Sequence, residues 1–452
     1  MHILKGYTKQ EISWMMYDWA NSAHSVIIVT LLPIFFDTVA GYTADSVSSM
    51  STWGYATSIA MLIVALAAPF LGVFGDIRGM RKKLFSFFML LGVAACAGMA
   101  FTPGMDFTSG PVAAGKVASL ILVLYIVSVI GFDASAIYYD AFLTDVTIED
   151  RMDKVSTMGY GLGYIGGSTI PLLIFLIMNL VGVPMLTCLA FVFGLTAVWW
   201  LAFSLPLLKN CEQTSGKPYE KGDVARSIKG VGTTIKEIIA NKPMLIYILS
   251  YFFYIDGVHT VISMATTYGT NLGLDSTGMM LALLLVQILG LPFCLLYIKC
   301  SEKFGARTMV GFGICVYMFI CIFAFFMNSL WQFWVLAVLC ATSQGGIQAL
   351  SRSMYGKLIP DKDRSGEFFG FFDIFGKFSS IMGPALVGVV SSVVANGMLG
   401  AQGLTAQTAT AEQIDAINAQ SSHYGILSII IIIIVGAVLY FGFLPKVEHA
   451  KQ

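Results

Sequence analysis

The sequence predicts an all-α integral membrane protein with twelve transmembrane helices, from its composition, the length of its apolar stretches and the placement of its basic residues. Of the 452 residues, 57% are hydrophobic and 12% are charged, against ~25% charged in an ordinary soluble domain. The mean hydropathy is +0.79. This composition excludes a water-soluble enzyme, a disordered chain and a disulfide scaffold. A net charge of zero leaves no basic surface for nucleic acid.

Twelve apolar stretches are each long enough to cross ~30 Å of hydrocarbon. Only helices satisfy every backbone group there without closing into a barrel, and continuous apolar runs of this length do not suit barrel strands. We therefore expect each stretch to be one membrane-spanning helix. The stretches lie at residues 12–36, 51–75, 84–102, 117–142, 155–180, 184–207, 243–268, 277–298, 309–327, 331–355, 366–396 and 422–445.

The basic residues predict how these helices are oriented. Of the 26 Lys and Arg residues, 23 lie at the two termini or in the loops after even-numbered stretches, and Lys116 is the one in an opposite-side loop. By the positive-inside rule, both termini are therefore cytoplasmic. The first stretch carries Asp18, Asn21 and His24 and no small-residue cleavage pattern. We expect it to remain as the first span, and a bacterial plasma membrane is the default location.

A polar stretch at residues 208–242 divides the chain into two halves of six spans. The N-terminal half is residues 1–207 and the C-terminal half is residues 243–452. Apolar residues within the stretch recur at steps of four and three, which predicts an amphipathic helix on the cytoplasmic surface of the membrane that tethers the halves. These apolar residues are Val224, Ile228, Val231, Ile235 and Ile238.

The loops after the second and eighth stretches share the pattern acid-x-x-Gly-x-Arg. Because the pattern recurs after the second span of each half, the halves repeat in the same orientation, which is the arrangement of a major facilitator transporter. The glycine permits a tight turn, while the acid and the arginine can form ion pairs in one conformation and release them in another. We expect the following residues to form a gate: Asp76, Gly79, Arg81, Glu302, Gly305 and Arg307.

Ionisable residues inside membrane spans cost ~2.5 to 3.5 kcal/mol each on insertion scales, so each one is a candidate functional residue. Five carboxylates outnumber two fixed bases inside the stretches. This excess favours proton carriage or a cationic group on the solute. The ionisable residues inside the stretches are Asp18, His24, Asp133, Asp140, Asp256, His259, Arg352, Asp373 and Lys377.

Most of these residues fall on stretches 1, 4, 7 and 10, which line the central cavity in the predicted fold. The tenth stretch places Gln344, Gln348 and Arg352 at steps of four, so they share one helix face, and Arg352 suits a carboxylate on the solute. We expect the coupling ion, H⁺ or Na⁺, to bind at Asp18, Asp133, Asp256 and His259. We expect the solute to contact Asn21, His24, Tyr139, Gln344, Gln348 and Arg352.

The sequence gives no support to the motifs that are typical of nucleotide-binding proteins, metalloproteins or hydrolases. The pattern G-x-G-x-x-G occurs at residues 161–166, but no strand precedes it, so it predicts no dinucleotide site. Gly159, Gly163 and Gly167 recur there at steps of four, which predicts a helix-packing face of small residues. The sequence has no metal-ligand spacing and no nucleophile elbow, so we expect no metal, no cofactor and no enzymatic activity.

A family resemblance rests on several of these segments. Residues 17–23 read YDWANSA, which resembles the signature of the vacuole-effluxer-like branch of the major facilitator superfamily, whose fungal members are linked to amino-acid release from the vacuole. Further similar segments are GYGLGYIGG at 159–167, DGV at 256–258, QGGIQALSRS at 344–353, FFG at 368–370 and GP at 383–384. The resemblance implies alternating access and efflux or exchange of a small solute such as an amino acid.

Two alternatives stay open. Asp18 and the loop from Thr144 to Arg151 also resemble the glycoside-pentoside-hexuronide sugar-cation symporters, and Tyr138 and Tyr139 with Trp19 could stack on a sugar. The second alternative is a membrane-embedded enzyme or a sensor that transports nothing, which the missing catalytic motifs disfavour. For the transporter we expect a small-molecule solute, H⁺ or Na⁺ and the lipid bilayer as partners, no nucleic acid, and a monomer.

Overall fold

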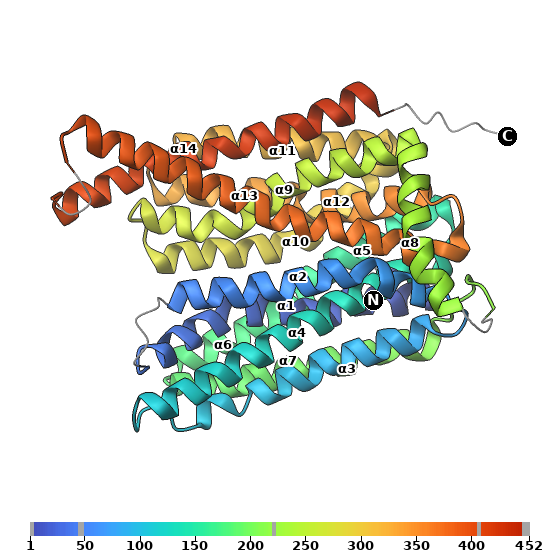
Figure 1. Cartoon of the computed structure of the whole chain (residues 1–452), viewed down its shortest axis with the longest axis horizontal. Helices are drawn as coiled ribbons and strands as arrows, with labels where there is room; N and C mark the ends of the chain where they lie inside the picture. Colours follow the sequence, from blue (N-terminus) through green and yellow to red (C-terminus); the bar gives the residue numbers. More distant parts are fainter. Residues whose placement is uncertain (1–3, 44–48, 219–222, 405–407, 445–452) are drawn as a thin grey trace. The chain divides into compact units, whose positions relative to one another are not determined.

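The computed structural model describes residues 4–43, 49–218, 223–404 and 408–444. Twelve helices within these ranges are long and apolar enough to cross a membrane, and Figure 1 shows them with their labels. The predicted fold class, an all-α integral membrane protein with twelve spans, is confirmed. The described residues contain no strand, and one isolated parallel bridge joins Ile77 to Lys217.

The first six spans are built from seven α-helices, a 3-10 helix and a π-helix. The fifth span consists of three consecutive segments, α5, η3 and α6, of which η3 is the π-helix. The elements up to the linker are α1 (Lys9–Ala40), α2 (Ser49–Gly75), α3 (Arg81–Met99), η2 (Thr102–Gly104), α4 (Pro111–Val146), α5 (Glu149–Gly163), η3 (Tyr164–Thr169), α6 (Ile170–Leu180) and α7 (Met185–Asn210).

The linker contributes one helix, α8, and six more spans follow it. The predicted amphipathic segment is indeed helical, since α8 covers it. The elements are α8 (Asp223–Ala240), α9 (Lys242–Asn271), α10 (Ser276–Phe304), α11 (Ala306–Phe325), α12 (Leu330–Leu358), η4 (Lys362–Arg364), α13 (Ser365–Ala401), α14 (Ala411–Val438) and η5 (Leu439–Phe443).

Local sequence explains where several helices begin. Thr8 caps α1, because its hydroxyl accepts from the backbone of Glu11 while the Glu11 carboxylate accepts from the backbone of Thr8. Thr410 and Gln413 form the same capping box ahead of α14. That cap begins α14 at Ala411, so the expectation that the last helix starts at residue 422 is wrong: the helix continues through polar turns before its apolar run begins.

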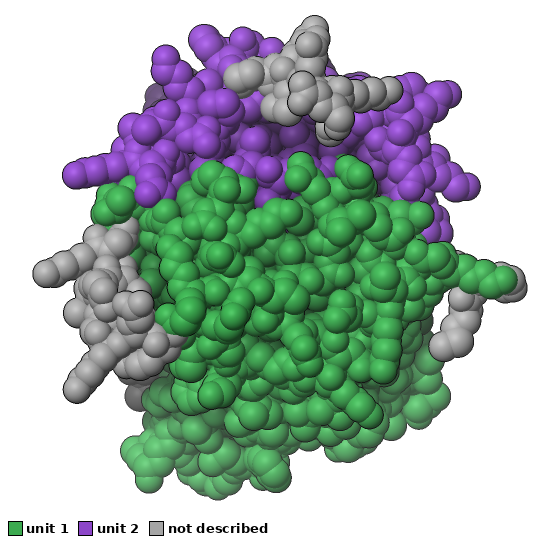
Figure 2. Space-filling model, turned by 90° about the vertical axis from the view of Figure 1, so that its right-hand side faces the viewer, with its two compact units in different colours: residues 1–234, 359–374 green, residues 235–358, 375–452 purple. Residues whose placement is uncertain are grey.

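The chain forms two compact units, which Figure 2 colours separately. Unit 1 is Met1–Thr234 with Ile359–Ile374, and unit 2 is Ile235–Leu358 with Phe375–Gln452. The predicted halves, 1–207 and 243–452 around a linker at 208–242, stay a prediction. Each unit has a core that contains fully buried aromatic side chains, among them Trp14, Tyr17, Tyr138, Tyr139 and Trp200 in unit 1 and Tyr247, Tyr254, Tyr317, Tyr355 and Tyr440 in unit 2.

In unit 1 the glycine face of the fifth span packs on α1. A Cβ atom on Gly163 would lie 2.6 Å from the Ser22 Oγ, and one on Gly167 would lie 2.5 Å from the Trp19 carbonyl oxygen. Such distances leave no room for any side chain at these positions. The predicted helix-packing face is confirmed, and the YDWANSA segment of α1 is what covers it.

Candidate functional site

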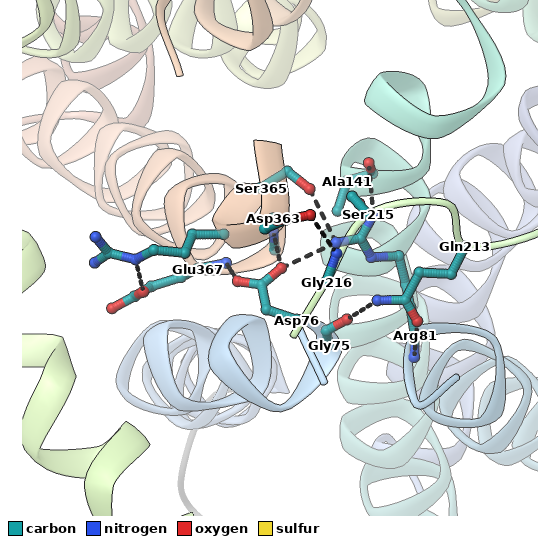
Figure 3. A network of polar contacts seen from close by, with 12 residues as sticks. Gly75, Asp76, Arg81, Ala141, Gln213, Ser215, Gly216, Asp363, Ser365 and Glu367 are labelled. Atoms are coloured by element: carbon teal, nitrogen blue, oxygen red, sulfur yellow. Dashed lines mark hydrogen bonds and ion pairs between the residues drawn. The ribbon is translucent and has the colours of Figure 1, made fainter. Parts of the chain in front are cut away.

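The Arg81 side chain is the centre of a buried polar network in unit 1 (Figure 3). Its Nη2 donates to the Asp76 Oδ1 at 2.9 Å and to the Ser365 Oγ at 2.9 Å. Its Nη1 donates to an Asp145 carboxylate oxygen, to the Ala141 carbonyl and to the Ser215 hydroxyl. Arg81 is fully buried, and a guanidinium is stable there only because carboxylates and hydrogen-bond acceptors surround it.

Asp76, beyond the end of α2, also caps α13. Its Oδ1 accepts from the Gly366 N–H at 2.7 Å and its Oδ2 accepts from the Glu367 N–H at 2.8 Å. These amides lie in the first turn of α13, where backbone N–H groups have no partner within the helix and attract negative charge. Burial raises the pKa of the Asp76 carboxyl to about 7, while Arg81 and the two amides oppose this rise.

Two glycines let α2 and α13 approach closely enough for this cap. A Cβ atom on Gly72 would lie 2.2 Å from the Gly366 carbonyl oxygen, and one on Gly366 would lie 2.6 Å from the Gly72 carbonyl oxygen. Backbone atoms cannot give way as a flexible side chain can. The contact between the end of α2 and the start of α13 therefore requires glycine on both sides.

The linker residues that follow α7 also contact the Arg81 network. The Gln213 Oε1 accepts from the backbone N–H groups of Gly79 and Arg81, and its Nε2 donates to the Gly75 carbonyl. Thr214 and Ser215 donate to the Asp145 carboxylate. The sequence analysis missed these residues, because a Gln, a Thr and a Ser in a polar loop carry no signal of their own.

The two predicted gate loops share a turn but differ in their contacts. Gly79 and Gly305 adopt φ values of +81° and +83°, as the turn prediction requires. Asp76 and Arg81 are brought together in the first loop. In the second loop Glu302 and Gly305 are exposed, and the Arg307 Nη2 donates to the Leu444 carbonyl at 2.8 Å.

The candidate residues of the first and fourth spans lie inside unit 1. The Tyr139 hydroxyl donates to the Asp18 Oδ2 at 2.8 Å, and the Tyr139 ring stacks on Trp14 with ring centroids 4.4 Å apart. The His24 Nε2 lies 3.2 Å from the Ser128 Oγ, and its ring stacks on Phe132. Tyr139 is buried, and so are the other residues of these two spans that we predicted to bind the ion or the solute, namely Asp18, Asn21, His24 and Asp133.

Asp256 is the fully buried carboxylate of α9 in unit 2. Its Oδ1 accepts from the Gly383 N–H at 2.9 Å and from the Thr260 hydroxyl at 3.4 Å. Its Oδ2 has no hydrogen-bond partner among the described residues. A Cβ atom on Gly383 would lie 1.8 Å from the Thr260 Oγ1, so a glycine at this position of α13 is what lets the backbone reach the carboxylate.

The remaining candidates lie on α9 and α12 in unit 2. The Gln348 side chain hydrogen-bonds His259 and also donates to the Gln344 carbonyl at 3.1 Å. Arg352 is buried, with 4% of its surface exposed. The structure thus brings His259 and Gln348 together, as the sequence could not show.

A cavity of about 100 Å³ lies within unit 2, and Gln344 is one of its lining residues. Its lining is mostly apolar, with side chains from α9, α10, α11, α12 and α14. Gln287 also lines it, and the Gln287 Oε1 has no hydrogen-bond partner among the described residues. Sequence reasoning missed Gln287, although a lone amide in an apolar helix was a usable signal.

In the described part of the chain, no three His, Cys, Asp or Glu residues are grouped so that they could hold a metal ion.

Comparisons with known proteins agree with this architecture. The family model described as "Vacuole effluxer Atg22 like" matches residues 7–397. YxiO of Bacillus subtilis strain 168, described as an uncharacterised MFS-type transporter, is 40% identical over 452 residues, which cover 98% of this chain and 96% of YxiO. Autophagy-related protein 22-1 of Penicillium rubens is 25% identical over 274 residues, 55% of this chain and 46% of the fungal protein.

Solved structures of low sequence identity share the fold. The proton:xylose symporter XylE superimposes with a TM-score of 0.71 at 14% identity, covering 97% of this chain and 95% of XylE. The human organic anion transporter MFSD10 gives a TM-score of 0.64 at 12% identity, covering 96% of this chain and 99% of MFSD10. Taken with the family match across most of its length, these results show that the chain is an MFS-type transporter and belongs to the vacuole effluxer Atg22-like family.

Proposed function

We propose that this transporter moves a small solute, an amino acid or a similar metabolite, by alternating access, and that the movement is coupled to protons. The observation that carries the coupling is the Asp256 carboxylate. It is fully buried, one of its oxygens accepts two hydrogen bonds and the other accepts none from a described residue. An ionised carboxylate in such a place costs several kcal/mol, and a bound proton removes that cost.

The proposal gives Asp256 a cycle of protonation. When the site faces one side of the membrane, the carboxylate takes up a proton, and when it faces the other side, hydration releases it. Asp18, Asp133 and His259 are further candidates for the coupling ion. Asn21, His24, Tyr139, Gln344, Gln348 and Arg352 are candidates for solute contact, and Arg352 would hold a solute carboxylate.

The solute is identified first by thermal unfolding of the detergent-purified protein with single amino acids, short peptides, sugars and Na⁺ at two pH values. A molecule that binds the folded state raises the unfolding temperature by mass action. We expect stabilisation by an amino acid, with a magnitude that depends on pH. Stabilisation by a sugar that requires Na⁺ would instead support a sugar-cation symporter, which the family match does not favour.

The coupling is tested with Asp256→Asn in proteoliposomes, using the amino acid that stabilises the protein most. We expect uptake driven by a pH gradient to fall to the level of empty liposomes, because an amide cannot carry the proton. Exchange of internal for external solute should persist, because it needs no net proton movement. Asp275→Asn is the matched control, since Asp275 caps α10 and Asn is an equally good cap. Gradient-driven uptake that survives Asp256→Asn would refute the role.

Orientation and location complete the proposal. The Arg81 network includes the loop after the second span and the linker after the sixth, two of the segments that hold most of the Lys and Arg residues. By the positive-inside rule, these segments are expected in the cytoplasm. We propose a cytoplasmic gate made by this network, with both termini on the same side and a bacterial plasma membrane as the location. Reporter fusions to the C-terminus test this, because alkaline phosphatase activity there would contradict the orientation.

A further inference from the structure

The linker segment Gln213–Lys217 makes more contacts with the Arg81 network than a tether requires. The Gly75 carbonyl lies at the end of α2, and the Arg81 amide lies at the start of α3. Backbone groups at helix ends have no partner within their own helix. Gln213 supplies a partner for both, at 2.9 Å to the Gly75 oxygen and 3.3 Å to the Arg81 nitrogen, and bonds the Gly79 amide at 2.8 Å. One carboxamide from the linker therefore caps two helices.

The linker backbone pairs with the same loop. The Arg78 N–H donates to the Lys217 carbonyl at 2.9 Å, and the Lys217 N–H donates to the Asp76 carbonyl at 2.9 Å. Gly216 has a φ of +112°, and a Cβ atom there would lie 2.6 Å from the Asp76 carbonyl oxygen. This close pairing fixes the backbone that carries the Asp76 carboxylate.

The linker also encloses the Arg81 side chain. The Asp145 Oδ1 accepts four hydrogen bonds from Thr214 and Ser215, at 2.7 to 3.1 Å. The other Asp145 oxygen accepts from Arg81, and the Ser215 Oγ accepts from the Arg81 Nη1 at 3.1 Å. The orientation of the guanidinium, and through it that of Asp76, thus depends on Ser215 and on the Asp145 carboxylate that the linker holds. Figure 3 shows Ser215 beside the guanidinium and Gln213 at the Gly75 carbonyl.

The linker reaches the start of α13 at two points. The Gly216 N–H donates to the Asp363 Oδ1 at 2.8 Å. Further along, the Thr234 hydroxyl of α8 bonds to Glu367 and accepts from Arg364, which itself pairs with Glu367 at 3.0 Å. The linker therefore contacts both partners of the proposed gate, the loop after α2 and the first turn of α13.

From these contacts we infer that Gln213 and Ser215 are positioning residues of the gate: they hold Arg81 and Asp76 in the one arrangement that can cap α13. The linker is then part of the gate, and its residues determine the stability of the state in which Asp76 caps α13. This inference rests on the gating role proposed above. It does not require a known solute or a coupling ion.

Hydrogen–deuterium exchange of individual amides tests the inference. The Gly366 and Glu367 amides donate to Asp76 and not to Gln213. In Gln213→Met, a substitution of similar volume without hydrogen bonds, we expect both amides to exchange about fivefold to tenfold faster, which corresponds to the loss of about one net hydrogen bond. The direct partners, Gly79 and Arg81, should exchange faster as well.

A matched control separates positioning from general loosening. Gln332 is a second glutamine that bonds a loop at a helix start, accepting from the Asn328 N–H at 2.8 Å and from the Ser329 hydroxyl at 2.7 Å. Gln332→Met should leave Gly366 and Glu367 unchanged. The inference is overturned if Gln213→Met accelerates Gly79 and Arg81 alone, or if Gln332→Met has the same effect on α13.

A second variant covers the case in which Gln213→Met does not yield folded protein. Ser215→Ala removes one donor to Asp145 and one acceptor of Arg81, and it should accelerate the same two α13 amides. Unchanged exchange in that variant overturns the inference. Because exchange is measured without solute, failure of the proton-coupling experiment on Asp256 and failure of this one are independent results.

Discussion

The Asp76 carboxylate accepts hydrogen bonds both from the Arg81 side chain, at the start of α3, and from backbone amides in the first turn of α13. Burial destabilises the ionised carboxylate more than these partners stabilise it. The pKa of the carboxyl is therefore raised to about 7 from an ordinary value of ~3.9. The capped state consequently binds a proton more tightly than a state in which the carboxyl is hydrated. Relative to the hydrated state, the capped state is therefore most stable at low pH, and it loses this stability as the pH rises through about 7.

This sign predicts how the gate responds to pH. We expect protection of the Gly366 and Glu367 amides, corrected for intrinsic exchange, to fall as the pH rises from the ordinary carboxyl pKa of ~4 to about 7, by at most about tenfold per unit, and to level off above that. Asp76→Asn should remove this dependence, because the amide does not titrate. Protection that stays flat or rises with pH in the parent protein would contradict the prediction.

At the scale of elements, the contact between α1 and the fifth span connects two of the segments that carry the family resemblance. The glycines at 163 and 167 press directly on α1 atoms, and η3 is a π-helix within that span. Such π-segments occur mostly as single turns, frequently at functional sites. Asp18 lies in the same contact, since a Cβ atom on Gly159 would be 2.4 Å from its Oδ2. Packing in this contact thus also holds a candidate coupling residue.

Gly167→Ala tests this contact. Its Cβ atom would lie 2.5 Å from the Trp19 carbonyl and 2.8 Å from the Ala23 nitrogen, so two helix backbones must separate. We expect the free energy of unfolding to fall by roughly 1–3 kcal/mol, seen as a lower unfolding temperature in detergent. Gly115→Ala in α4 is the control, because a Cβ atom there meets nothing within 4 Å. Equal effects of the two substitutions would argue against the packing face.

At the scale of the whole molecule, the alternating access proposed above requires the α2–α13 contact to form and to break. The contact is made by backbone atoms of Gly72 and Gly366 and by the cap from Asp76. Its strength therefore depends on a close approach that any side chain prevents. Gly72 and Gly366 are 294 residues apart in the chain, so this contact belongs to the folded molecule and to neither segment alone.

Gly72→Ala is expected to shift the molecule towards the conformation with this gate open. The new Cβ atom would lie 2.2 Å from the Gly366 carbonyl oxygen, so the capped state is destabilised while the open state is untouched. Faster exchange at the Gly366 and Glu367 amides is the readout. Gly54→Ala, on the same helix in open space, should have no such effect. Unchanged exchange in Gly72→Ala would show that the contact does not hold the gate.

Particular residues show how far the sequence could predict the site. Asp76, Gly79 and Arg81 were recognisable because they lie within six residues of one another, in a pattern that the second half repeats. Asp18 and Tyr139 were each predicted, one for the ion and one for the solute, yet the hydrogen bond that joins them spans 121 residues of chain. Gln213 was not predicted, because its role comes entirely from helix ends more than 130 residues away.

The sequence by itself determined the twelve helices. A segment in hydrocarbon must satisfy its backbone hydrogen bonds locally, so length and hydropathy are sufficient to specify a spanning helix. Only the tertiary structure decided which polar groups meet, including Arg81 with Asp145, Gln213 with the ends of α2 and α3, and Asp76 with the first turn of α13. Those pairings depend on how closely backbones approach in space, and spacing along a chain does not encode that distance.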